Sequence, residues 1–274
     1  MDRRRRKCNN CSKPGHTDRY CTEPVTSYGV VAYNRGSSGP LFLIIERKNS
    51  IAFIEFAYGR YSLDDVEYIR LLFSEMTTGE LQMIRRTRSY ADIVERVRGT
   101  APRVPPYYGG GRLRFEVLKN GYLTSSGVLV TADALIDSVI RRVTRMSVWE
   151  LPKGRRLCNE SALTCAMREL GEETHIERRY FRMTTEQETL RDEFVSYNGV
   201  CYRSVFFVAE CTLSRESLAA TESDFVQNRE VSRIRWVTLS EARRLISKDS
   251  LVHLLEYADL MVGEDREPEG PDLC

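Results

Sequence analysis

The alternation of apolar and polar residues along the chain predicts a mixed α/β protein. Near the start, the apolar runs YGVVAYN and LFLIIERK flank a polar turn and predict two strands joined by a loop. The stretch IAFIEFAY at 51–58 is also apolar and rich in β-branched and aromatic residues. Further strands are predicted from SVWELPK at 147–153, from the run at 199–213 and from IRWVTL at 234–239.

Apolar residues three and four positions apart predict amphipathic helices between these strands. Asp64 opens one helix, whose apolar positions are Val66, Ile69, Leu72 and Phe73. The runs TGELQMIRRT, SYADIVERVRG, SEARRLI and LVHLLEYADLM predict more helices, as does ALIDSVIRRVTRM at 134–146. The strongest helical pattern covers 159–173, with Asn159 as its N-cap. The segment at 100–114 is rich in Pro, Gly and Tyr and is predicted to be a loop.

These 274 residues suit one large domain with attachments. We predict a basic arm with a Cys/His cluster over 1–25, an α/β domain over 26–262 with a helical insertion at about 59–146, and an acidic disordered tail over 263–274. No run of 18 apolar residues predicts a membrane span. The arm lacks the apolar segment of a secretory signal, so we expect a reducing, cytoplasmic compartment in which thiols stay free or bind metal.

The formal net charge is only +2, from 41 basic and 39 acidic residues, which excludes a protein that coats nucleic acid through a global basic excess. The basic residues are nevertheless unevenly placed. Arg3, Arg4, Arg5, Arg6 and Lys7 form the arm. The arginines that we assign to helices of the insertion are Arg85, Arg86, Arg88, Arg96, Arg98, Arg141, Arg142 and Arg145.

Three of the eight cysteines and one of the three histidines fall in the first 21 residues. The four residues are Cys8, Cys11, His16 and Cys21. Thiolate and imidazole are the ligands of tetrahedral zinc, and Gly15 allows the tight backbone path that a small cage needs. The spacing Cys-x2-Cys-x4-His-x4-Cys is that of the retroviral-type zinc knuckle, which binds single-stranded RNA.

The surroundings of this cluster favour RNA. Lys13 and Arg19 can contact phosphates, and Tyr20 can stack on a base. Two other interpretations stay open: the spacing is accidental in a tail of free thiols, or zinc binds but serves only as a staple of the fold or a protein contact. The cysteines without ligand spacing, Cys158, Cys165, Cys201 and Cys211, are interpreted as ordinary core or surface residues.

A second cluster consists of Glu169, Glu172 and Glu173, whose spacing places three carboxylates on one helical face. Like charges repel, and a hard divalent cation such as Mg²⁺ or Mn²⁺ is their natural partner. A neighbouring apolar face, made by Leu163, Ala166, Met167 and Leu170, can pin the helix to a sheet. The alternative is a solvent-exposed acidic helix without a metal.

The wider segment at 154–176 resembles the Nudix signature, Gly-x5-Glu-x7-Arg-Glu-U-x-Glu-Glu-x-Gly-U. The matching positions are Gly154, Glu160, Arg168, Glu169, Leu170, Glu172, Glu173 and Ile176. His175 stands where the family has a glycine that usually ends the helix in a left-handed turn. Because His tolerates this conformation better than most residues, we expect a local backbone change without loss of the site.

The resemblance to Nudix hydrolases implies an α/β/α sandwich around a mixed sheet, here with a helical insertion and a small N-terminal zinc knuckle. It implies hydrolysis of a nucleoside diphosphate linked to another group. By family role, the three clustered glutamates would hold Mg²⁺ or Mn²⁺, Arg168 would orient them, and Glu160 would support the loop before the helix. Glu230 would add a metal ligand or general base, with Glu186, Glu188 and Glu193 as rivals.

Substrate binding is assigned to the residues that lead into the motif. The set consists of Glu150, Lys153, Gly154 and Arg155. Lys153, Arg155 and Arg156 can steer and clamp phosphates. A methylated cap base would need an aromatic surface. The available aromatic residues are Tyr58, Tyr61, Tyr107, Tyr108 and Phe115.

The segment WELPKG at 149–154 resembles the entry to the motif in mRNA-decapping Nudix enzymes and in diphosphoinositol polyphosphate hydrolases. Together with SIAFIEFAYGRYS at 50–62 and ISK at 246–248, it resembles the decapping Nudix proteins of large cytoplasmic DNA viruses, of the African swine fever virus type. In that family the insertion serves RNA binding. The resemblance implies a hydrolase of capped RNA that releases methylated GDP and 5′-monophosphate RNA, in the cytoplasm of an infected host cell.

Two other functions remain open from the sequence. The basic loop also suits small molecules, so the chain is alternatively a hydrolase of diphosphoinositol polyphosphates or dinucleoside polyphosphates. His175, the one departure from the signature, is compatible with a non-catalytic RNA-binding protein on a Nudix scaffold. The sequence carries no signal for an oligomeric state.

Overall fold

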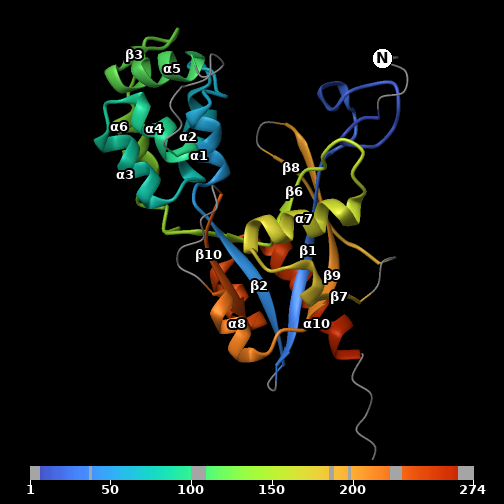
Figure 1. The fold of residues 1–274 in the computed structure, drawn as a ribbon. Coiled ribbons are helices and arrows are strands. Elements are labelled where there is room, and N and C mark those ends of the chain that lie inside the picture. Colours follow the sequence, from blue (N-terminus) through green and yellow to red (C-terminus); the bar gives the residue numbers. More distant parts are fainter. Residues whose placement is uncertain are drawn as a thin grey trace, which may run out of the picture. The chain divides into compact units, whose positions relative to one another are not determined.

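The computed structural model describes residues 7–36, 39–99, 109–184, 188–196, 199–222 and 230–264 (Figure 1). The chain divides into two compact units. The sheet unit consists of Met1–Glu46 and Trp149–Cys274, and the helical unit is Arg47–Val148. Several predictions fall outside the described residues, namely those on Arg3–Arg6, Tyr107, Tyr108, Glu186 and most of the acidic tail.

Within the described part of the chain, an eight-stranded sheet forms the centre of the sheet unit. Its strands are β1 (Val25–Gly36), β2 (Gly39–Arg47), β5 (Val148–Glu150), β6 (Lys153–Gly154), β7 (Phe181–Met183), β8 (Leu190–Val195), β9 (Cys201–Cys211) and β10 (Val231–Val237). The central order is β10-β2-β1-β9-β7. β1 pairs antiparallel with β2 and β6 and parallel with β9. The predicted mixed sheet is therefore confirmed.

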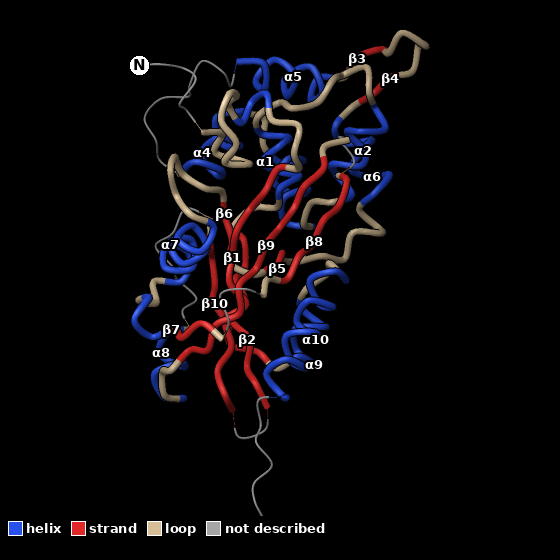
Figure 2. The backbone as a smooth tube through the Cα atoms, turned by 90° about the vertical axis from the view of Figure 1, so that its right-hand side faces the viewer, coloured by secondary structure: helices blue, strands red, loops and turns tan. Residues whose placement is uncertain are grey.

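Successive residues of β1 serve two different cores, as the period of two along a strand requires. Val30 and Ala32 pack in the core that contains α7, whereas Val31 and Tyr33 pack in the core that contains α9 and α10. The helices are α7 (Ala162–Thr174), α8 (Arg215–Thr221), α9 (Leu239–Leu245) and α10 (Asp249–Glu264). Figure 2 shows α7 and α8 on one side of the strands and α9 and α10 on the other, which confirms the α/β/α sandwich. Two 3₁₀ turns, Asp18–Tyr20 and Arg178–Tyr180, also lie in the described part of this unit.

The ends of α7 differ from the prediction. Ser161, not Asn159, is the N-cap: its side chain accepts a hydrogen bond from the Thr164 N–H, while Asn159 lies outside the helix in a left-handed conformation (φ +62°). At the other end His175 is itself left-handed (φ +58°) and its N–H donates to Gly171 O. The expected backbone change is therefore wrong, since His175 keeps the turn that a glycine would make.

The helical unit contains α1 (Ile51–Ala57), α2 (Val66–Ser74), α3 (Thr78–Arg86), α4 (Tyr90–Arg98), α5 (Gly109–Asn120), α6 (Ala132–Val139) and a short hairpin of β3 (Tyr122–Leu123) and β4 (Leu129–Val130). The apolar stretch at 51–58 is a helix, because Ser50 caps it by accepting from the Phe53 N–H. The unit starts at Arg47 and so takes in α1, which precedes the insertion predicted at about 59–146.

Two further predictions for this unit are wrong. Residues 109–114 form the start of α5 and not a loop. The helix predicted at 134–146 begins earlier, because Thr131 caps it, and ends at Val139. The arginines expected on it, Arg141, Arg142 and Arg145, therefore follow the helix. The charge of Arg145 is used locally, as its Nη1 donates to Glu75 O at 2.9 Å.

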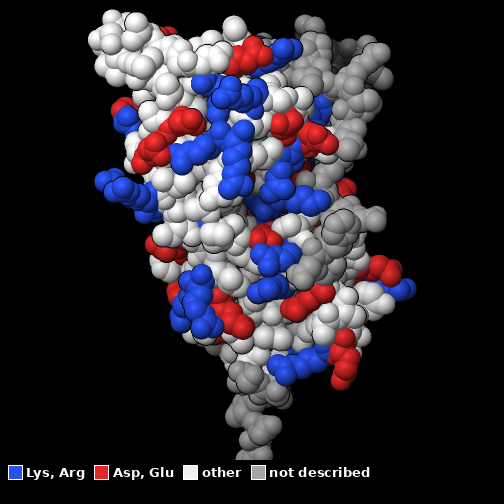
Figure 3. Space-filling view, turned by 90° about the vertical axis from the view of Figure 1, so that its left-hand side faces the viewer, with Lys and Arg blue, Asp and Glu red and all other residues white. Residues whose placement is uncertain are grey.

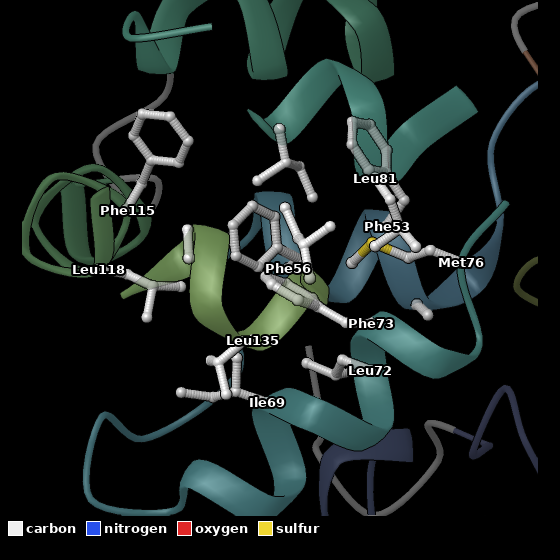
Figure 4. Close-up of a cluster of buried hydrophobic side chains, with 14 of the residues drawn as sticks. Phe53, Phe56, Ile69, Leu72, Phe73, Met76, Leu81, Phe115, Leu118 and Leu135 are labelled. Carbon is white, nitrogen blue, oxygen red and sulfur yellow. The ribbon is translucent and has the colours of Figure 1, made fainter. Parts of the chain in front are cut away.

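Aromatic packing holds the helical unit together (Figure 4). Phe56 stacks on Tyr61 at 5.4 Å between ring centroids and meets Phe73 edge-on at the same distance. Tyr61 and Phe115 are buried in this core, so both are packing residues and not exposed surfaces for a cap base. No helix of the described residues is long and apolar enough to cross a membrane.

Candidate functional site

The Cys/His residues of the N-terminal segment converge as the spacing predicts. One ligand atom from each of Cys8, Cys11, His16 and Cys21 lies within 4.8 Å of all the others. Two backbone hydrogen bonds fold the turn between the first cysteines: Ser12 N donates to Cys8 O at 2.8 Å and Cys8 N to Lys13 O at 2.9 Å. Gly15 has a φ of +96° and so supplies the tight turn before His16.

The environment of Cys21 favours the thiolate, which is the form that binds metal. Burial opposes ionisation, but hydrogen bonds from Asn10 and His16 outweigh it and lower the pKa of Cys21 to about 6. Burial instead raises the pKa of Cys11, whose Sγ lies 3.3 Å from His16 Nε2. A compact set of three sulfurs and one imidazole nitrogen could hold zinc.

The second cluster depends on a close approach between α7 and residues 153–157, which we call the Nudix loop after the motif that they begin. A Cβ atom added to Gly154 would lie 2.1 Å from Glu169 Cδ, which a real side chain cannot do. Gly154 is fixed in this position because β6 pairs with β1, where Tyr28 lies opposite Gly154. The glycine therefore lets the Glu169 carboxylate pass directly against the loop backbone.

Arg168 organises the carboxylates around it. Its Nε and Nη2 bind the two oxygens of Glu160 at 2.8 and 3.0 Å, while Nη1 donates to Glu169 at 2.8 Å and to Glu172 at 2.9 Å. The hydrogen bond from Arg168 lowers the pKa of Glu160. Burial raises the pKa of Glu169, and the charges of Glu172 and Glu230 add to that effect while Arg168 opposes it.

Glu173 is 5% exposed and accepts a hydrogen bond from the Lys153 backbone N–H at 2.9 Å. The Lys153 ammonium is paired with Glu150 at 2.6 Å, so two of the four residues predicted to bind substrate are engaged with each other. Arg155 is exposed, whereas the guanidinium of Arg156 donates to Asn10 O at 2.7 Å. Arg156 is thus tied to the Cys/His segment, and its part in phosphate binding stays a prediction.

A pocket of about 770 Å³ lies against the carboxylate face of α7. It is lined by Met167, Arg168, Glu169, Gly171, Glu172, Glu173, His175, Ile176, Glu177, Arg178 and Glu230. Glu230 is therefore brought to the motif glutamates, although it lies far from them in sequence. Two of its rivals lie among the described residues and do not line the pocket: Glu193 pairs with Arg203 at 2.6 Å, and Glu188 is absent from the lining.

Sequence reasoning missed Arg178 as a residue of this pocket and considered His175 only as a helix end. Arg178 lies two residues after the last position of the motif. Nothing in the sequence places it in the pocket, because its position depends on the turn that His175 makes at the end of α7. Arg178 forms no ion pair with any other described residue, whereas Arg168 pairs with three carboxylates. The pocket therefore offers one cation that is not already neutralised.

The pocket could hold a divalent cation, since hard cations bind carboxylate oxygens. The glutamates fit this role in chemistry, since burial raises the pKa of Glu169, the charges of Glu172 and Glu230 add to the rise, and a cation would offset those charges. Among the described residues, however, only the Cys/His cluster has three or more ligand atoms mutually within 4.8 Å. Glu169 and Glu172 instead both accept a hydrogen bond from Arg168 Nη1, at 2.8 and 2.9 Å.

Comparison with known proteins defines the class. The NUDIX domain matches residues 123–255, which include the whole loop and α7, and a viral relative is 30% identical over 209 residues that cover 75% of this chain and 79% of the relative. The chain therefore belongs to the NUDIX family. That relative is the mRNA-decapping protein g5R of African swine fever virus (strain Badajoz 1971 Vero-adapted).

Other relatives are similar over comparable lengths. A protein of Acanthamoeba polyphaga mimivirus, named provisionally as an mRNA-decapping protein, is 23% identical over 326 aligned positions that cover 88% of this chain and 89% of its own length. Among solved structures, a binary complex of a C. elegans Ap4A hydrolase has a TM-score of 0.43 and 12% identity, and covers 87% of this chain and 98% of its own.

Proposed function

We propose that this chain is a metal-dependent hydrolase that removes the cap of mRNA. The observation that carries the proposal is a complete Nudix carboxylate cluster at one pocket, in a chain whose viral relatives are named mRNA-decapping proteins. Water adds to a phosphorus of the cap pyrophosphate chain, and a phosphorus–oxygen bond breaks. The products are a methylated guanosine diphosphate and RNA with a 5′-monophosphate.

The roles of the site residues follow from their positions. We assign metal binding to Glu169, Glu172 and Glu173. Glu230, which lines the same pocket from outside α7, is assigned as the base that accepts the proton of the attacking water. When bound, Mg²⁺ or Mn²⁺ supplies charge neutralisation of the pyrophosphate and a lower pKa for water. Arg168 positions Glu169 and Glu172, and Glu160 in turn holds Arg168 with two hydrogen bonds.

Phosphate binding is assigned to basic side chains that form no ion pair with the other described residues. Arg155 is exposed beside Gly154, and Arg178 lines the pocket. Lys153 contributes through its backbone N–H, which holds Glu173, because its ammonium is paired with Glu150. These residues suit the pyrophosphate of a cap and would equally suit a small nucleotide or an inositol pyrophosphate, which the assay below separates.

RNA binding is assigned to the Cys/His cluster, with zinc as its ion. Tyr20 is 71% exposed, and the Arg19 guanidinium lies 5.8 Å from its ring centroid. An exposed ring flanked by a cation suits a stacked base and a phosphate. Figure 3 shows a face on which Lys and Arg side chains lie in groups among acidic ones, so local basic surfaces exist despite the near-neutral total. The cytoplasmic location expected from the sequence stays a prediction.

The test is release of labelled nucleotide from cap-labelled RNA in the presence of Mn²⁺. We expect the full chain to release methylated GDP. Glu172→Gln should abolish most of the release, because it removes a proposed metal ligand, and it should spare the fold, because the Glu172 side chain is exposed. Glu216→Gln, an exposed glutamate on α8, is the matched control. Absence of product from the wild-type protein, with turnover of a diphosphoinositol polyphosphate instead, would overturn the proposal.

A further inference from the structure

The segment that carries the Cys/His cluster is built into the Nudix loop through Arg156. This side chain leaves the loop that follows Gly154, donates from Nη2 to Asn10 O at 2.7 Å, and places its guanidinium carbon 5.0 Å from the centroid of the Tyr28 ring. Its Nε is buried without a partner among the described residues. The guanidinium is therefore wedged between the cluster and β1.

Asn10 is itself fixed from two sides. Its Nδ2 donates to Cys21 Sγ at 3.3 Å and to Pro24 O at 2.9 Å, and its Oδ1 accepts from Thr26 N at 2.8 Å. One amide thus joins a proposed zinc ligand to the first residues of β1. The carbonyl that receives Arg156 belongs to the same residue, so its position depends on the Cys/His cluster being closed.

The other end of the loop reaches the carboxylates. Arg155 O accepts from Arg168 Nη2 at 3.0 Å, and Arg168 also binds Glu169 and Glu172. Tyr28, under the Arg156 guanidinium, is the β1 partner of Gly154, which lies against Glu169. A continuous set of contacts therefore runs from Cys21 through Asn10 and Arg156 to the carboxylate face of α7.

We propose that Arg156 is a positioning residue and that zinc in the Cys/His cluster sets the geometry of the Nudix loop. A zinc-loaded cluster holds Asn10 O, Asn10 O holds Arg156, and Arg156 holds residues 153–157 against β1 and α7. The kinetic part of this inference rests on the proposed hydrolase activity, whereas the structural part does not.

This role differs in its consequences from RNA delivery by a tethered arm. If the cluster only captured RNA, its loss would raise KM and leave kcat intact. If it positions the loop, misplacement of Gly154 and Glu169 lowers kcat at saturating RNA, since small displacements of reacting groups slow chemistry strongly.

The first experiment measures kcat and KM of the full chain on capped RNA. We expect Arg156→Met to lower kcat by about tenfold with KM changed less than about twofold. Arg156→Lys, which keeps a donor for Asn10 O and a cation over Tyr28, should recover much of that loss. Arg244→Met, on the exposed side of α9, is the control and should match the wild type. A rise in KM with kcat retained would overturn the positioning role.

The second experiment needs no substrate. Lys153 N and Leu157 N donate to Glu173 and Glu160 at 2.9 Å each, so their hydrogen exchange reports loop order. We expect faster exchange at both amides in Arg156→Met and in the cluster variant Cys11→Ser, with the amides of α10 unchanged as a reference for global folding. Unchanged exchange at 153–157 in Cys11→Ser, with demonstrated zinc loss, would overturn the coupling. A wild-type protein that does not turn over RNA would count against the proposed function. The exchange experiment would still test the coupling between the Cys/His cluster and the loop, because it needs no substrate.

Discussion

The two units each contain a nearly buried glutamate, and the two carboxylates have opposite surroundings. In the helical unit, Glu80 is 4% exposed and accepts from Ser50 N at 2.7 Å, Ser50 Oγ at 2.8 Å and Thr77 N at 2.8 Å. In the sheet unit, Glu169 shares a pocket with Glu172 and Glu230. Burial together with their charges raises the pKa of Glu169, although the hydrogen bond from Arg168 opposes the rise.

The difference separates a carboxylate that stabilises from one that is arranged for chemistry. Glu80 caps two helices, because it gathers neutral donors at the starts of both α1 and α3. Glu169 gathers like charges, which cost stability unless a cation binds. Carboxylates with unfavourable neighbours in a pocket mark functional sites. Four substitutions test this comparison, in order of decreasing expected effect.

Glu169→Gln should produce the largest change in activity. Loss of a proposed metal ligand should lower kcat by about a thousandfold, which corresponds to about 4 kcal/mol. Because the pKa of Glu169 is raised in the folded state, its ionisation at neutral pH opposes folding, and Gln removes that opposition. The melting temperature should therefore hold or rise. Decapping rates and thermal unfolding on the same preparations decide this, and a fall in both would place Glu169 with the structural carboxylates.

Glu80→Ala should do the reverse. It leaves the buried N–H of Ser50 without its acceptor and removes three hydrogen bonds, so the free energy of unfolding should fall by about 3 kcal/mol. Denaturation followed by far-ultraviolet circular dichroism gives the value. Glu95→Ala, on the exposed side of α4, is the matched control and should change stability by less than about 0.5 kcal/mol. An equal effect of the two variants would contradict the assignment.

Gly154→Ala should lower kcat by about a hundredfold, since the added Cβ meets the Glu169 carboxylate and displaces it. Gly79→Ala in α3, where a Cβ meets nothing closer than Thr77 Oγ1 at 4.0 Å, should stabilise the protein by about 0.5–1 kcal/mol. Steady-state kinetics and thermal unfolding distinguish them. Full activity in Gly154→Ala would mean that the approach of Glu169 to the loop is not needed.

Arg178→Ala should have the smallest effect of the four. Arg178 lines the pocket and forms no ion pair with the other described residues. Its removal should raise KM for capped RNA by about tenfold, the value of one charge-assisted hydrogen bond. Arg179→Ala is the neighbouring control, because Arg179 pairs with Glu177 and its side chain is 67% exposed outside the pocket lining. Equal KM values for the two variants would remove Arg178 from the site.

Much of the sheet unit could be predicted because its signals are local. The period of two in β1, the helical spacing of the glutamates and the Cys/His spacing each fix geometry over a few residues, and the fold confirms the sandwich and the convergence of the Cys/His ligands. The roles of the site residues stay predictions. The start of α7 failed because Asn159 and Ser161 are both good caps, and only the loop conformation decides between them.

The failures in the helical unit have similar causes. The segment at 51–58, in which seven of eight residues are apolar, suits a buried strand or a buried helix. The choice depends on Ser50 and on Glu80, which lies 30 residues away from Ser50. The contact of Arg156 with Asn10 spans 146 residues and leaves no trace in the local pattern. Arg156 in the sequence looks like any other loop cation until the fold supplies its partner.

β2 ends at the first residue of the helical unit, and β5, which begins at the last residue of that unit, pairs with β2. The chain thus leaves and re-enters the sheet through adjacent strands, as in a domain insertion. A short linker that bridges these strands would close a small loop, and the conformational entropy lost on closing a small loop is low. The helical unit can therefore be removed. A chain with a Gly/Ser linker in place of residues 48–147 should still assemble the sheet, the Cys/His cluster and α7. Such a chain would make the hydrolytic centre available as a separate minimal protein.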